Sequence, residues 1–346
     1  MPDAQSIEIA GVAIGRPHPC YVIAEIGINH HGDEGLCAEM ISAAAAAGAN
    51  AVKLQTVTPH ESYHPDTESF RAFKDSVLNE AALARLMAQA KSEGVALFST
   101  PGDPTALDML VRLEMPAIKI SSGLLTNIPL IERASASGRP LILSTGMAEA
   151  REVADAVGSA RAAGCTALAV LQCTSLYPAP ADALNLAAMA TLTELAAAPV
   201  GYSDHHEGYV ACLAAVAMGA SLVEKHFTLN TDQAGADHAI SLDPSDFAAM
   251  VRDLRSVEAM QGSAAKEPDP REAALRGGRH RFLVAARDLE AGERIGEADL
   301  YLMRLPDGRS ALPARDLNKV VGRRASENVE RLSGLAASDV EGIEDQ

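Results

Sequence analysis

Charged side chains occur inside otherwise apolar segments of this sequence. Glu25 follows the apolar run Tyr21–Ala24, and Lys53 and Lys119 each stand between aliphatic residues. Because a buried charge loses its hydration, such residues indicate internal ion pairs or a ligand of opposite charge. The two lysines could bind one phosphate or carboxylate group, or they could pair with Glu25 and Glu224. We favour the anion and keep the ion pairs as the alternative.

Two histidines, His205 and His226, stand near carboxylates at the ends of successive apolar segments. Asp204, Glu224 and Asp237 stand beside them in the chain. A single histidine in such a place is usually a hydrogen-bonding residue of the core. Two neutral imidazoles on neighbouring strands can instead bind one divalent cation and leave coordination positions open for substrate. We therefore predict a weakly held metal ion.

Eight short apolar segments can position these residues. They are Tyr21–Ile26, Ala51–Leu54, Ala96–Phe98, Ala117–Ile120, Leu141–Leu143, Ala167–Leu171, Pro199–Gly201 and Ser221–Val223. Alanine-rich amphipathic segments, such as residues 34–47 and 244–260, fill the intervals. This alternation predicts a closed (β/α)8 barrel, with an open doubly wound sheet as the alternative. In a barrel, the polar residues after each segment would meet at the C-terminal end, where enzymes of this fold carry their active sites.

The composition changes after the predicted barrel and divides the chain. The barrel would span residues 1–262, and a hairpin over residues 6–15 could close its other end. Residues 263–279 are rich in Gly, Ser, Pro and charged residues, which is typical of a linker. Residues 280–346 contain short strand-like pieces and predict a small β-rich domain.

The overall composition excludes some classes of partner. The chain has 346 residues and a formal net charge of −17, with no basic stripe, so nucleic acid is not expected as a ligand. Its apolar runs are too short to predict a membrane span. The five cysteines are scattered, and none forms a Cys-x-x-Cys pair, which favours a reduced, cytoplasmic protein.

The polar motifs at the strand ends match those of a known family, in order along the chain. They are Ala24-Glu25-Ile26-Gly27, Val52-Lys53-Leu54-Gln55-Thr56, Phe98-Ser99-Thr100-Pro101, Ile118-Lys119-Ile120-Ser121-Ser122-Gly123, Leu143-Ser144-Thr145-Gly146-Met147, Cys173-Thr174-Ser175-Leu176-Tyr177-Pro178, Gly201-Tyr202-Ser203-Asp204-His205 and Glu224-Lys225-His226-Phe227-Thr228. The sequence resembles the sialic acid synthase family, which includes N-acetylneuraminate synthase and related nonulosonic acid synthases. The resemblance implies a TIM barrel followed by an antifreeze-like (SAF) domain.

The resemblance also implies a reaction and a role for each matching residue. Phosphoenolpyruvate would condense with the open-chain aldehyde of an N-acyl hexosamine such as N-acetylmannosamine and release phosphate, assisted by Mn²⁺ or Mg²⁺. Phosphoenolpyruvate would contact Lys53, Thr100, Lys119, Ser122, Ser144, Ser175 and Ser203, while the metal would be bound by His205 and His226. The sugar would contact Gln55, Tyr177, Asp237, Phe282 and Arg304. Glu25 would handle the proton, so we assign catalysis to Glu25, Lys53, Lys119 and His205.

Several positions depart from the family pattern, and all of them concern the sugar side. Leu124 stands where the family usually has a glutamate that contacts the sugar, and Gln172 stands where it has a histidine. The lid loop after Arg304 differs, so that Arg309 competes with Arg304 for the role of the lid arginine. Residues 58–78 also differ from the family. We therefore expect the family's donor with a changed acceptor.

Other functions remain as alternatives to the sialic acid synthase reaction. The chain could be another phosphoenolpyruvate–aldose synthase or a metal-dependent aldolase that uses pyruvate. It could also be an inactive, carbohydrate-binding relative, as Leu124 alone suggests. By resemblance we expect a homodimer in which each C-terminal domain caps the partner's barrel, although the linker also permits each domain to cap its own barrel.

Overall fold

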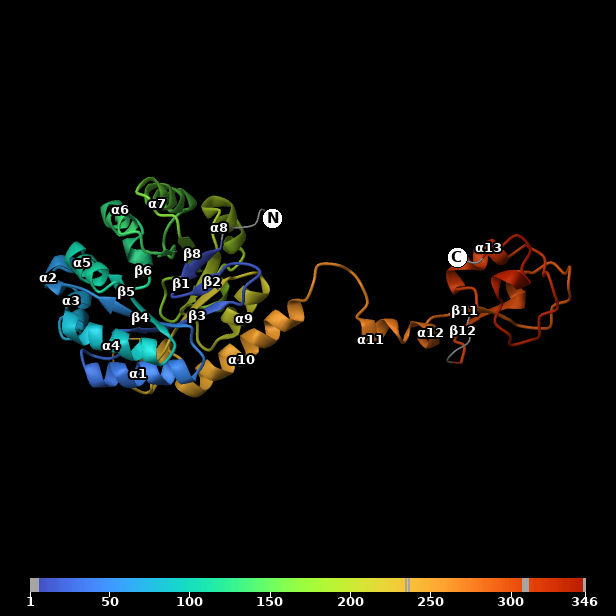
Figure 1. The fold of residues 1–346 in the computed structure, drawn as a ribbon, viewed down its shortest axis with the longest axis horizontal. Helices are drawn as coiled ribbons and strands as arrows, with labels where there is room; N and C mark the ends of the chain where they lie inside the picture. Colours follow the sequence, from blue (N-terminus) through green and yellow to red (C-terminus); the bar gives the residue numbers. More distant parts are fainter. Residues whose placement is uncertain (1–5, 234, 236, 307–310, 345–346) are drawn as a thin grey trace. The chain divides into compact units, whose positions relative to one another are not determined.

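The computed structural model describes residues 6–233, 235, 237–306 and 311–344. Within these residues the chain forms two compact units, Met1–Gly262 and Ser263–Gln346, each with its own hydrophobic core. Figure 1 shows a barrel surrounded by helices in the first unit and a small β-containing domain in the second. The candidate site lies in the first unit.

Within the described residues, eight parallel strands close into a barrel. They are β3 (Tyr21–Gly27), β4 (Ala51–Thr56), β5 (Ala96–Pro101), β6 (Ile118–Ile120), β7 (Leu141–Ser144), β8 (Leu168–Cys173), β9 (Val200–Asp204) and β10 (Leu222–His226). Each strand pairs with the next one along the chain, and β10 pairs with β3 to complete the closure. The predicted (β/α)8 barrel is confirmed, and the open-sheet alternative is wrong.

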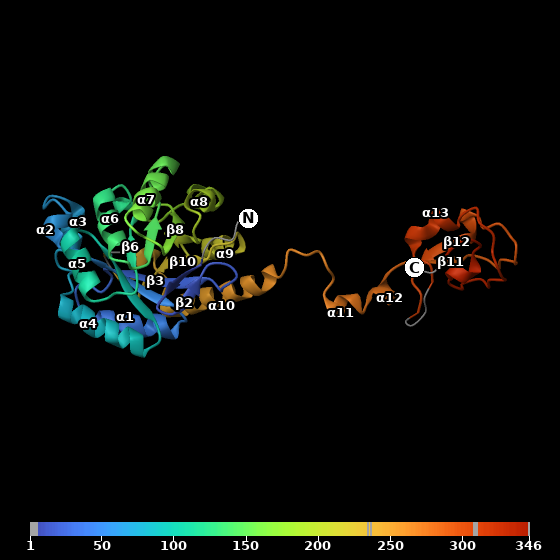
Figure 2. The ribbon, with the colours of Figure 1, turned by 45° about the horizontal axis from the view of Figure 1, so that its top comes forward.

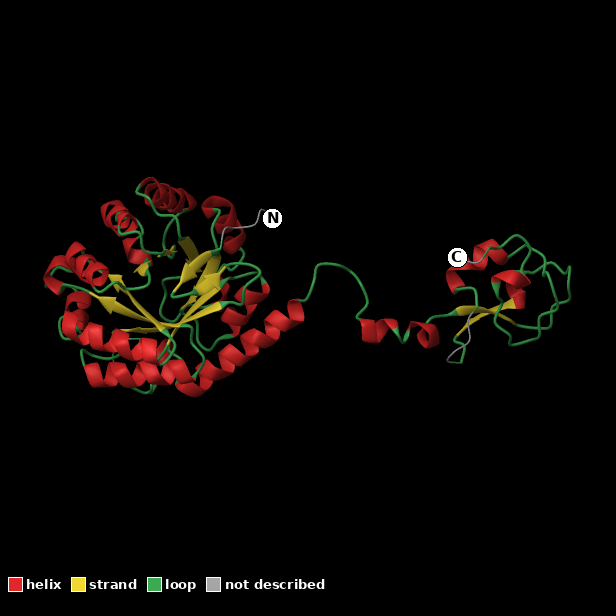
Figure 3. Ribbon diagram, viewed as in Figure 1, coloured by secondary structure: helices red, strands yellow, loops and turns green. Residues whose placement is uncertain are grey.

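Helices surround the strands, as Figure 3 shows. The main ones are α1 (Glu34–Ala46), α4 (Glu80–Ser92), α5 (Pro104–Arg112), α6 (Ile128–Ala136), α7 (Ala150–Ala162), α8 (Ala188–Ala196), α9 (Val210–Ala217) and α10 (Pro244–Gln261). Asp33, Asn79, Asp103 and Asp243 each accept a hydrogen bond from a backbone N–H in the first turn of the helix that follows. These caps fix where the helices begin.

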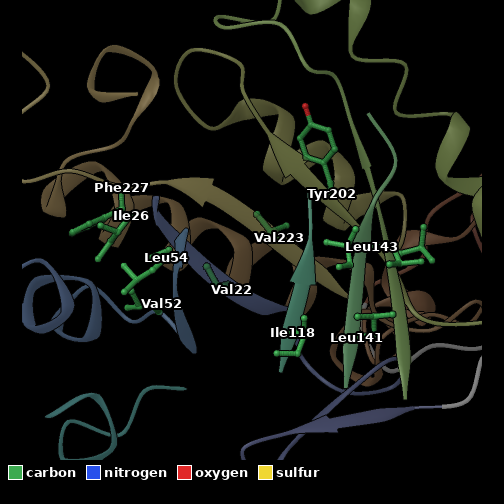
Figure 4. Close-up of a cluster of buried hydrophobic side chains, with 14 of the residues drawn as sticks. Val22, Ile26, Val52, Leu54, Ile118, Leu141, Leu143, Tyr202, Val223 and Phe227 are labelled. Carbon is green, nitrogen blue, oxygen red and sulfur yellow. The ribbon is translucent and has the colours of Figure 1, made fainter. Parts of the chain in front are cut away.

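The main hydrophobic core lies between the strands and the helices. Val22, Val52, Ile118, Leu143 and Val223 are fully buried there, and Figure 4 shows them. Successive side chains of a strand point to opposite faces. The residues that alternate with this core therefore face the inside of the barrel, where the functional residues can lie.

A hairpin closes the N-terminal end of the barrel, as predicted. It consists of β1 (Ile7–Ile9) and β2 (Val12–Ile14), which pair in antiparallel fashion. Their isoleucines form a separate core with the lower interior residues of the barrel strands, among them Tyr21, Phe98 and Leu222. The inside of the barrel is therefore packed with apolar side chains below the level of the polar residues.

Most of the strands continue past the apolar segments that predicted them, and β9 and β10 show this clearly. The apolar run at β9 stops at Gly201 and the one at β10 stops at Val223, yet the strands extend to Asp204 and His226. Their hydrogen-bonded register with neighbouring strands continues through these polar residues. Ser203 and Glu224 thus belong to rigid strands rather than to loops.

The connection between β4 and α4 contains two short helices, α2 (Pro59–Ser62) and α3 (Glu68–Phe73). Figures 1 and 2 both place them beside α5. Ser62 Oγ and the Thr58 backbone N–H each donate a hydrogen bond of 2.6 Å to Asp103, the N-cap residue of α5. This connection, called the 58–78 segment below, is therefore anchored to the barrel near the C-terminal end of β5.

The second unit contains α11 (Pro270–Ala273), α12 (Arg276–Arg279), β11 (Phe282–Ala285), β12 (Leu300–Met303) and α13 (Leu317–Val320). The strands β11 and β12 are antiparallel, and their buried residues pack with Leu289, Ile295 and Leu335 in a small core. Across the described parts of both units, every helix is too short or too polar to cross a membrane.

Candidate active site

A cavity at the C-terminal end of the barrel strands brings together the residues that the sequence singled out in the barrel. Its volume is about 540 Å³. It is lined by Glu25, Lys53, Gln55, Thr100, Lys119, Ser122, Ser144, Ser175, Tyr177, Ser203, His205, His226 and Asp237. These residues come from all eight strands or from the loops that follow them. Closure of the barrel is therefore what places them around one space.

Buried ion pairs form the floor of this cavity. Lys53 forms an ion pair with Glu25, and its Nζ lies 3.9 Å from Glu224 Oε2. Lys119 Nζ lies 3.5 Å from Glu224 Oε1 and donates a hydrogen bond of 2.7 Å to Ser144 Oγ. The structure thus shows the ion-pair alternative for the two lysines. Two positive charges face two negative charges, which offsets much of the cost of burying them.

Glu224 was not assigned to the site, although it was considered as an ion-pair partner of the lysines and as a carboxylate beside the two histidines. It is 4 % exposed and lies near both lysines, and Ser203 Oγ donates a hydrogen bond of 2.8 Å to its Oε1. The sequence contained a signal for this position. Glu224 follows the apolar Val223 and lies two residues before the site residue His226. Counting alternate residues back from His226 places Glu224 inside the barrel.

The two buried carboxyl groups have opposite pKa shifts. Burial raises the pKa of Glu25, although the positive charge of Lys53 opposes it. Burial also acts on Glu224, but there Lys119 and Lys53 prevail and lower its pKa to about 2. Glu224 therefore stays ionised, whereas Glu25 can hold a proton more readily. Carboxyl pairs that differ in this way often divide acid–base and electrostatic roles.

Hydroxyl groups and one thiol surround the lysines. Lys53 Nζ donates a hydrogen bond of 3.3 Å to Thr100 Oγ1. Cys173, which the sequence analysis did not assign to the site, lies between Ser122 and Ser175, with its Sγ 3.1 Å and 4.0 Å from their respective hydroxyl oxygens. These groups can donate hydrogen bonds to several oxygens of one anion.

The two predicted metal ligands are neighbours at the mouth of the cavity. The ring centroids of His205 and His226 are 5.2 Å apart. His205 Nδ1 lies 2.7 Å from the Thr174 carbonyl oxygen, so this nitrogen carries the proton and Nε2 is free to bind on the other side. Nε2 lies 3.0 Å from Tyr177 Oη. Asp237 Oδ2 lies 3.4 Å from His226 Nε2.

These side chains fit a weakly held divalent cation. Burial, followed by the charge of His226, lowers the pKa of His205 to about 4, so its imidazole is neutral near pH 7. Neutral imidazole is the form that binds a metal ion. In the described part of the chain, no three His, Cys, Asp or Glu side chains are grouped closely enough to hold a metal. Oxygen atoms of a substrate or water would have to complete the coordination.

Asp204 does not belong to this group of carboxylates, so its expected place beside the histidines is corrected. Its Oδ2 forms an ion pair of 3.1 Å with Lys225, and Tyr202 Oη donates a hydrogen bond of 3.0 Å to its Oδ1. Both Asp204 and Lys225 are fully buried. The reason is strand alternation, because Ser203 faces the cavity and the next residue faces the helices.

Gln172 also lies away from the cavity, which corrects its assignment to the sugar side. Its Nε2 donates a hydrogen bond of 3.1 Å to the Leu184 carbonyl oxygen, while its neighbour Cys173 lines the cavity. Leu124, in contrast, does line the cavity, as do Tyr63 and Phe73 of the 58–78 segment. The departures from the family pattern that bear on the barrel cavity are therefore Leu124 and this segment.

The remaining predicted residues belong to the second unit. Phe282 begins β11, where it pairs with Met303, and Arg304 is exposed directly after β12. Arg309, the rival lid arginine, lies outside the described residues.

Comparisons with known proteins identify the two units. The NeuB family matches residues 40–266, and the SAF domain matches residues 280–341. The chain is 35% identical to N,N'-diacetyllegionaminic acid synthase of Legionella pneumophila, over 91% of this chain and 93% of that protein. It is 30% identical to N-acetylneuraminate-9-phosphate synthase of Mus musculus, over 95% of this chain and 94% of that protein.

A solved structure agrees with these matches. The crystal structure of N-acetylneuraminic acid (sialic acid) synthetase from Leptospira borgpetersenii, in complex with citrate, is similar with a TM-score of 0.75 and 33% identity. The similarity covers 80% of this chain and 98% of that chain. The resemblance seen in the motifs is confirmed, and so is the C-terminal SAF domain. The chain belongs to the NeuB family and carries a SAF domain after its barrel.

Proposed function

We propose that this protein condenses phosphoenolpyruvate with the open-chain aldehyde of an N-acyl hexosamine, forming a nonulosonic acid and releasing phosphate. As a member of the NeuB family it is a condensing synthase, and relatives named as legionaminic, sialic and pseudaminic acid synthases support this reaction. One observation carries the proposal further. Two buried lysines and several hydroxyl groups line the same cavity as a pair of histidines.

The lysine floor is suited to the donor. Lys53 and Lys119 would turn from Glu25 and Glu224 toward the carboxylate and phosphate of phosphoenolpyruvate. Hydrogen bonds would come from Thr100, Ser122, Ser144, Ser175 and Ser203, which all line the cavity. Charge-assisted hydrogen bonds of this kind are the strongest that a protein offers to an anion. The main effect of these hydrogen bonds would be to hold the charged groups of phosphoenolpyruvate in position.

The reaction then follows from groups around the donor. The methylene carbon of phosphoenolpyruvate attacks the aldehyde carbon, a C–C bond forms, and the aldehyde oxygen gains a proton to become a hydroxyl. Positive charge develops on the carbon that bears the phosphate, and water adds there. Glu25 would accept the proton that this water loses. The C–O bond to phosphate then breaks, the new hydroxyl loses its proton, and a keto acid remains.

A divalent cation, Mn²⁺ or Mg²⁺, would be held by His205 and His226. When bound, it would polarise the aldehyde carbonyl as a Lewis acid. The Thr174 carbonyl fixes the orientation of His205, and Tyr177 and Asp237 are within reach of the two rings. Tyr177 and Asp237, together with Gln55, would bind the sugar.

The second unit would complete the acceptor site. We assign sugar contacts to Phe282 and Arg304, supplied to the partner's barrel in a domain-swapped homodimer.

We also propose a cytoplasmic location, since all five cysteines are free and buried, as expected in a reducing compartment.

A phosphate-release assay tests the proposed reaction. The full-length protein is incubated with phosphoenolpyruvate, Mn²⁺ and a panel of N-acyl hexosamines and plain aldoses. We expect phosphate only when donor, cation and an N-acyl hexosamine are all present. Consumption of pyruvate instead would support the aldolase, and release with plain aldoses would support a different aldose synthase. Sugar binding without phosphate release would support an inactive relative.

A further inference from the structure

An apolar wall forms one side of the active-site cavity, and the 58–78 segment supplies its two aromatic rings. Tyr63 and Phe73 line the cavity, and their ring centroids are 5.1 Å apart at an interplanar angle of 33°. Both side chains are half-buried, so part of each remains accessible. Hydrogen bonds from the same segment to Asp103 hold its first turn against the barrel. The aromatic pair is therefore anchored beside the cavity.

Neighbouring loops continue this wall. Val57 follows β4, Leu124 follows β6 and Met147 follows β7, and all three line the cavity. In the closed strand order, β4 to β7 are successive, and β9 and β10 lie across the barrel from β5 and β6. The wall thus lies opposite the strands that carry His205 and His226. One side of the cavity is apolar and the other presents imidazoles.

Charged residues are absent from the loop part of this wall. In the part of the chain that the structure describes, the loop residues that line the cavity after β4 to β7 are all uncharged: Val57, Ser62, Tyr63, Ser69, Phe73 and Met147, with Gly102 and the residues 121–124. A phosphate or carboxylate group placed against its aromatic and aliphatic side chains would lose hydration without gaining a charged partner there. Aromatic rings, in contrast, favour contact with C–H groups.

We propose that Tyr63 and Phe73 form the platform on which the acceptor sugar lies, and that together with Leu124 they select its substituents. The acceptor presents C–H groups or the methyl group of an acyl substituent to this wall, and it carries no phosphate ester there. The aldehyde end then points across the cavity toward His205 and His226. This inference rests on the proposed function, since it names the acceptor class for the same cavity.

Substitutions within the 58–78 segment test the platform with a matched control. Phe73→Ala removes a wall ring. Phe70→Ala removes a half-buried ring of the same helix that makes an edge contact with His60, with ring centroids 4.9 Å apart, and does not line the cavity. We expect Phe73→Ala to raise the KM for the acceptor about tenfold, the effect of losing one aromatic contact. The KM for phosphoenolpyruvate should not change, and Phe70→Ala should leave both values near wild type.

A second pair of substitutions tests the selection of substituents. Leu124→Glu places a charge in the wall, and Leu124→Met keeps it apolar at similar volume. We expect Leu124→Glu to weaken the use of an acceptor that presents a methyl group by about tenfold or more, because the carboxylate must be desolvated. Leu124→Met should reduce the use of the same acceptor less than Leu124→Glu does. Wild-type protein should prefer N-acetylmannosamine to its 6-phosphate.

Binding measured without turnover separates this inference from the proposed reaction. Saturation-transfer NMR on the full-length protein, with Mg²⁺ present and phosphoenolpyruvate omitted, should show transfer to the acyl methyl protons, reduced in Phe73→Ala but not in Phe70→Ala. Equal effects of both variants, preference for the phosphorylated sugar, or no binding of any sugar would overturn the platform. Sugar binding that depends on Phe73 without phosphate release would refute the reaction and support the platform.

Discussion

Glu25 and Glu224 are two carboxyl groups of one buried cluster, yet their environments separate their protonation states. Glu224 lies near both Lys53 and Lys119 and accepts a hydrogen bond from Ser203, all of which favour its charged form. Glu25 pairs with Lys53 alone, and burial raises its pKa. The residue that is easier to protonate is the better candidate to exchange a proton during a reaction.

Glu25→Gln removes this proton-exchanging group at nearly constant shape. We expect kcat for phosphate release to fall by roughly 10²- to 10⁴-fold, the usual contribution of a general acid or base. The KM for phosphoenolpyruvate should change little, because both lysines remain. Steady-state kinetics with circular dichroism as a control for folding checks this outcome. A variant that keeps the wild-type kcat would exclude Glu25 from the proton transfer.

His30 couples the stability of the protein to acid. Burial, and then the neighbouring His31, lowers the pKa of His30 from 6.5 to about 4. Its Nδ1 accepts a hydrogen bond of 3.0 Å from the Gly32 backbone N–H, which requires the neutral ring. Between these two pH values the unfolded chain binds a proton that the folded chain does not bind. The folded state therefore loses stability as the pH falls from 6.5 to 4.

His30→Asn removes this titration and can keep the acceptor for Gly32. We expect the free energy of unfolding of the wild type to fall between pH 6.5 and pH 4 by up to about 3 kcal/mol more than that of the variant. Urea unfolding at a series of pH values measures the difference. Identical pH dependence in both proteins would show that His30 is not buried in its neutral form.

At the scale of residues, the sequence predicted which residues belong to the site better than it predicted their interaction partners. Lys53 and Lys119 were recognised because a charge inside an apolar run requires an explanation. Their pairing with Glu25 and Glu224 could not be decided, because Glu224 is far from both lysines in the chain and meets them only when the barrel closes. Gln172 was wrongly assigned to the sugar side of the cavity, because the alternation of side chains along its strand was not considered.

The strands β9 and β10 carry two different polar layers, one on each face. Ser203, Glu224 and His226 face the cavity, whereas Asp204 and Lys225 form a buried ion pair on the face toward the helices. Lys225 Nζ also donates a hydrogen bond to the His206 carbonyl oxygen. This contact ties the end of β9 to β10. The pair therefore fixes the two strands that hold the predicted metal ligands.

Lys225→Met leaves Asp204 buried without its ion-pair partner. We expect the free energy of unfolding to fall by about 3–5 kcal/mol, the typical cost of breaking a buried pair on one side. Arg85→Ala is the control, because it breaks an exposed pair with Glu34 and should hardly change the unfolding midpoint. Chemical denaturation of both variants measures the effect. Equal midpoints would show that the Asp204–Lys225 pair contributes nothing to stability.

At the scale of elements, periodicity found every barrel strand but not every boundary. Apolar runs mark the part of a strand that packs on both faces, so the prediction for β10 stopped at Val223. The polar continuation to His226 is held by hydrogen bonds to its neighbours, which sequence pattern alone does not show. The helices α2 and α3 were likewise not predicted, because they are short and largely exposed.

The whole molecule combines two units that contain different predicted site residues. The barrel contains the cavity with the two buried lysines and the histidine pair, while the second unit contains Phe282 and Arg304. If each second unit serves the partner's barrel, a functional site draws residues from two chains. Division of a site between chains is a property of the dimer that either chain alone lacks.

Mixing two inactive variants tests this division. Glu25→Gln disables the barrel, and Arg304→Ala disables the lid. In a domain-swapped heterodimer of the two, one site has both parts intact, so we expect about a quarter of wild-type activity after random subunit exchange, since half of the dimers are mixed and each has one of two sites intact. Coexpression followed by the phosphate-release assay measures the recovery. No recovery in proven heterodimers would show that each second unit serves its own barrel.

The hairpin of β1 and β2 has a consequence for access to the cavity. Because its isoleucines close the N-terminal end of the barrel, the cavity is reached from the C-terminal end. In the proposed reaction, both substrates would therefore enter, and both products would leave, on the same side of the barrel.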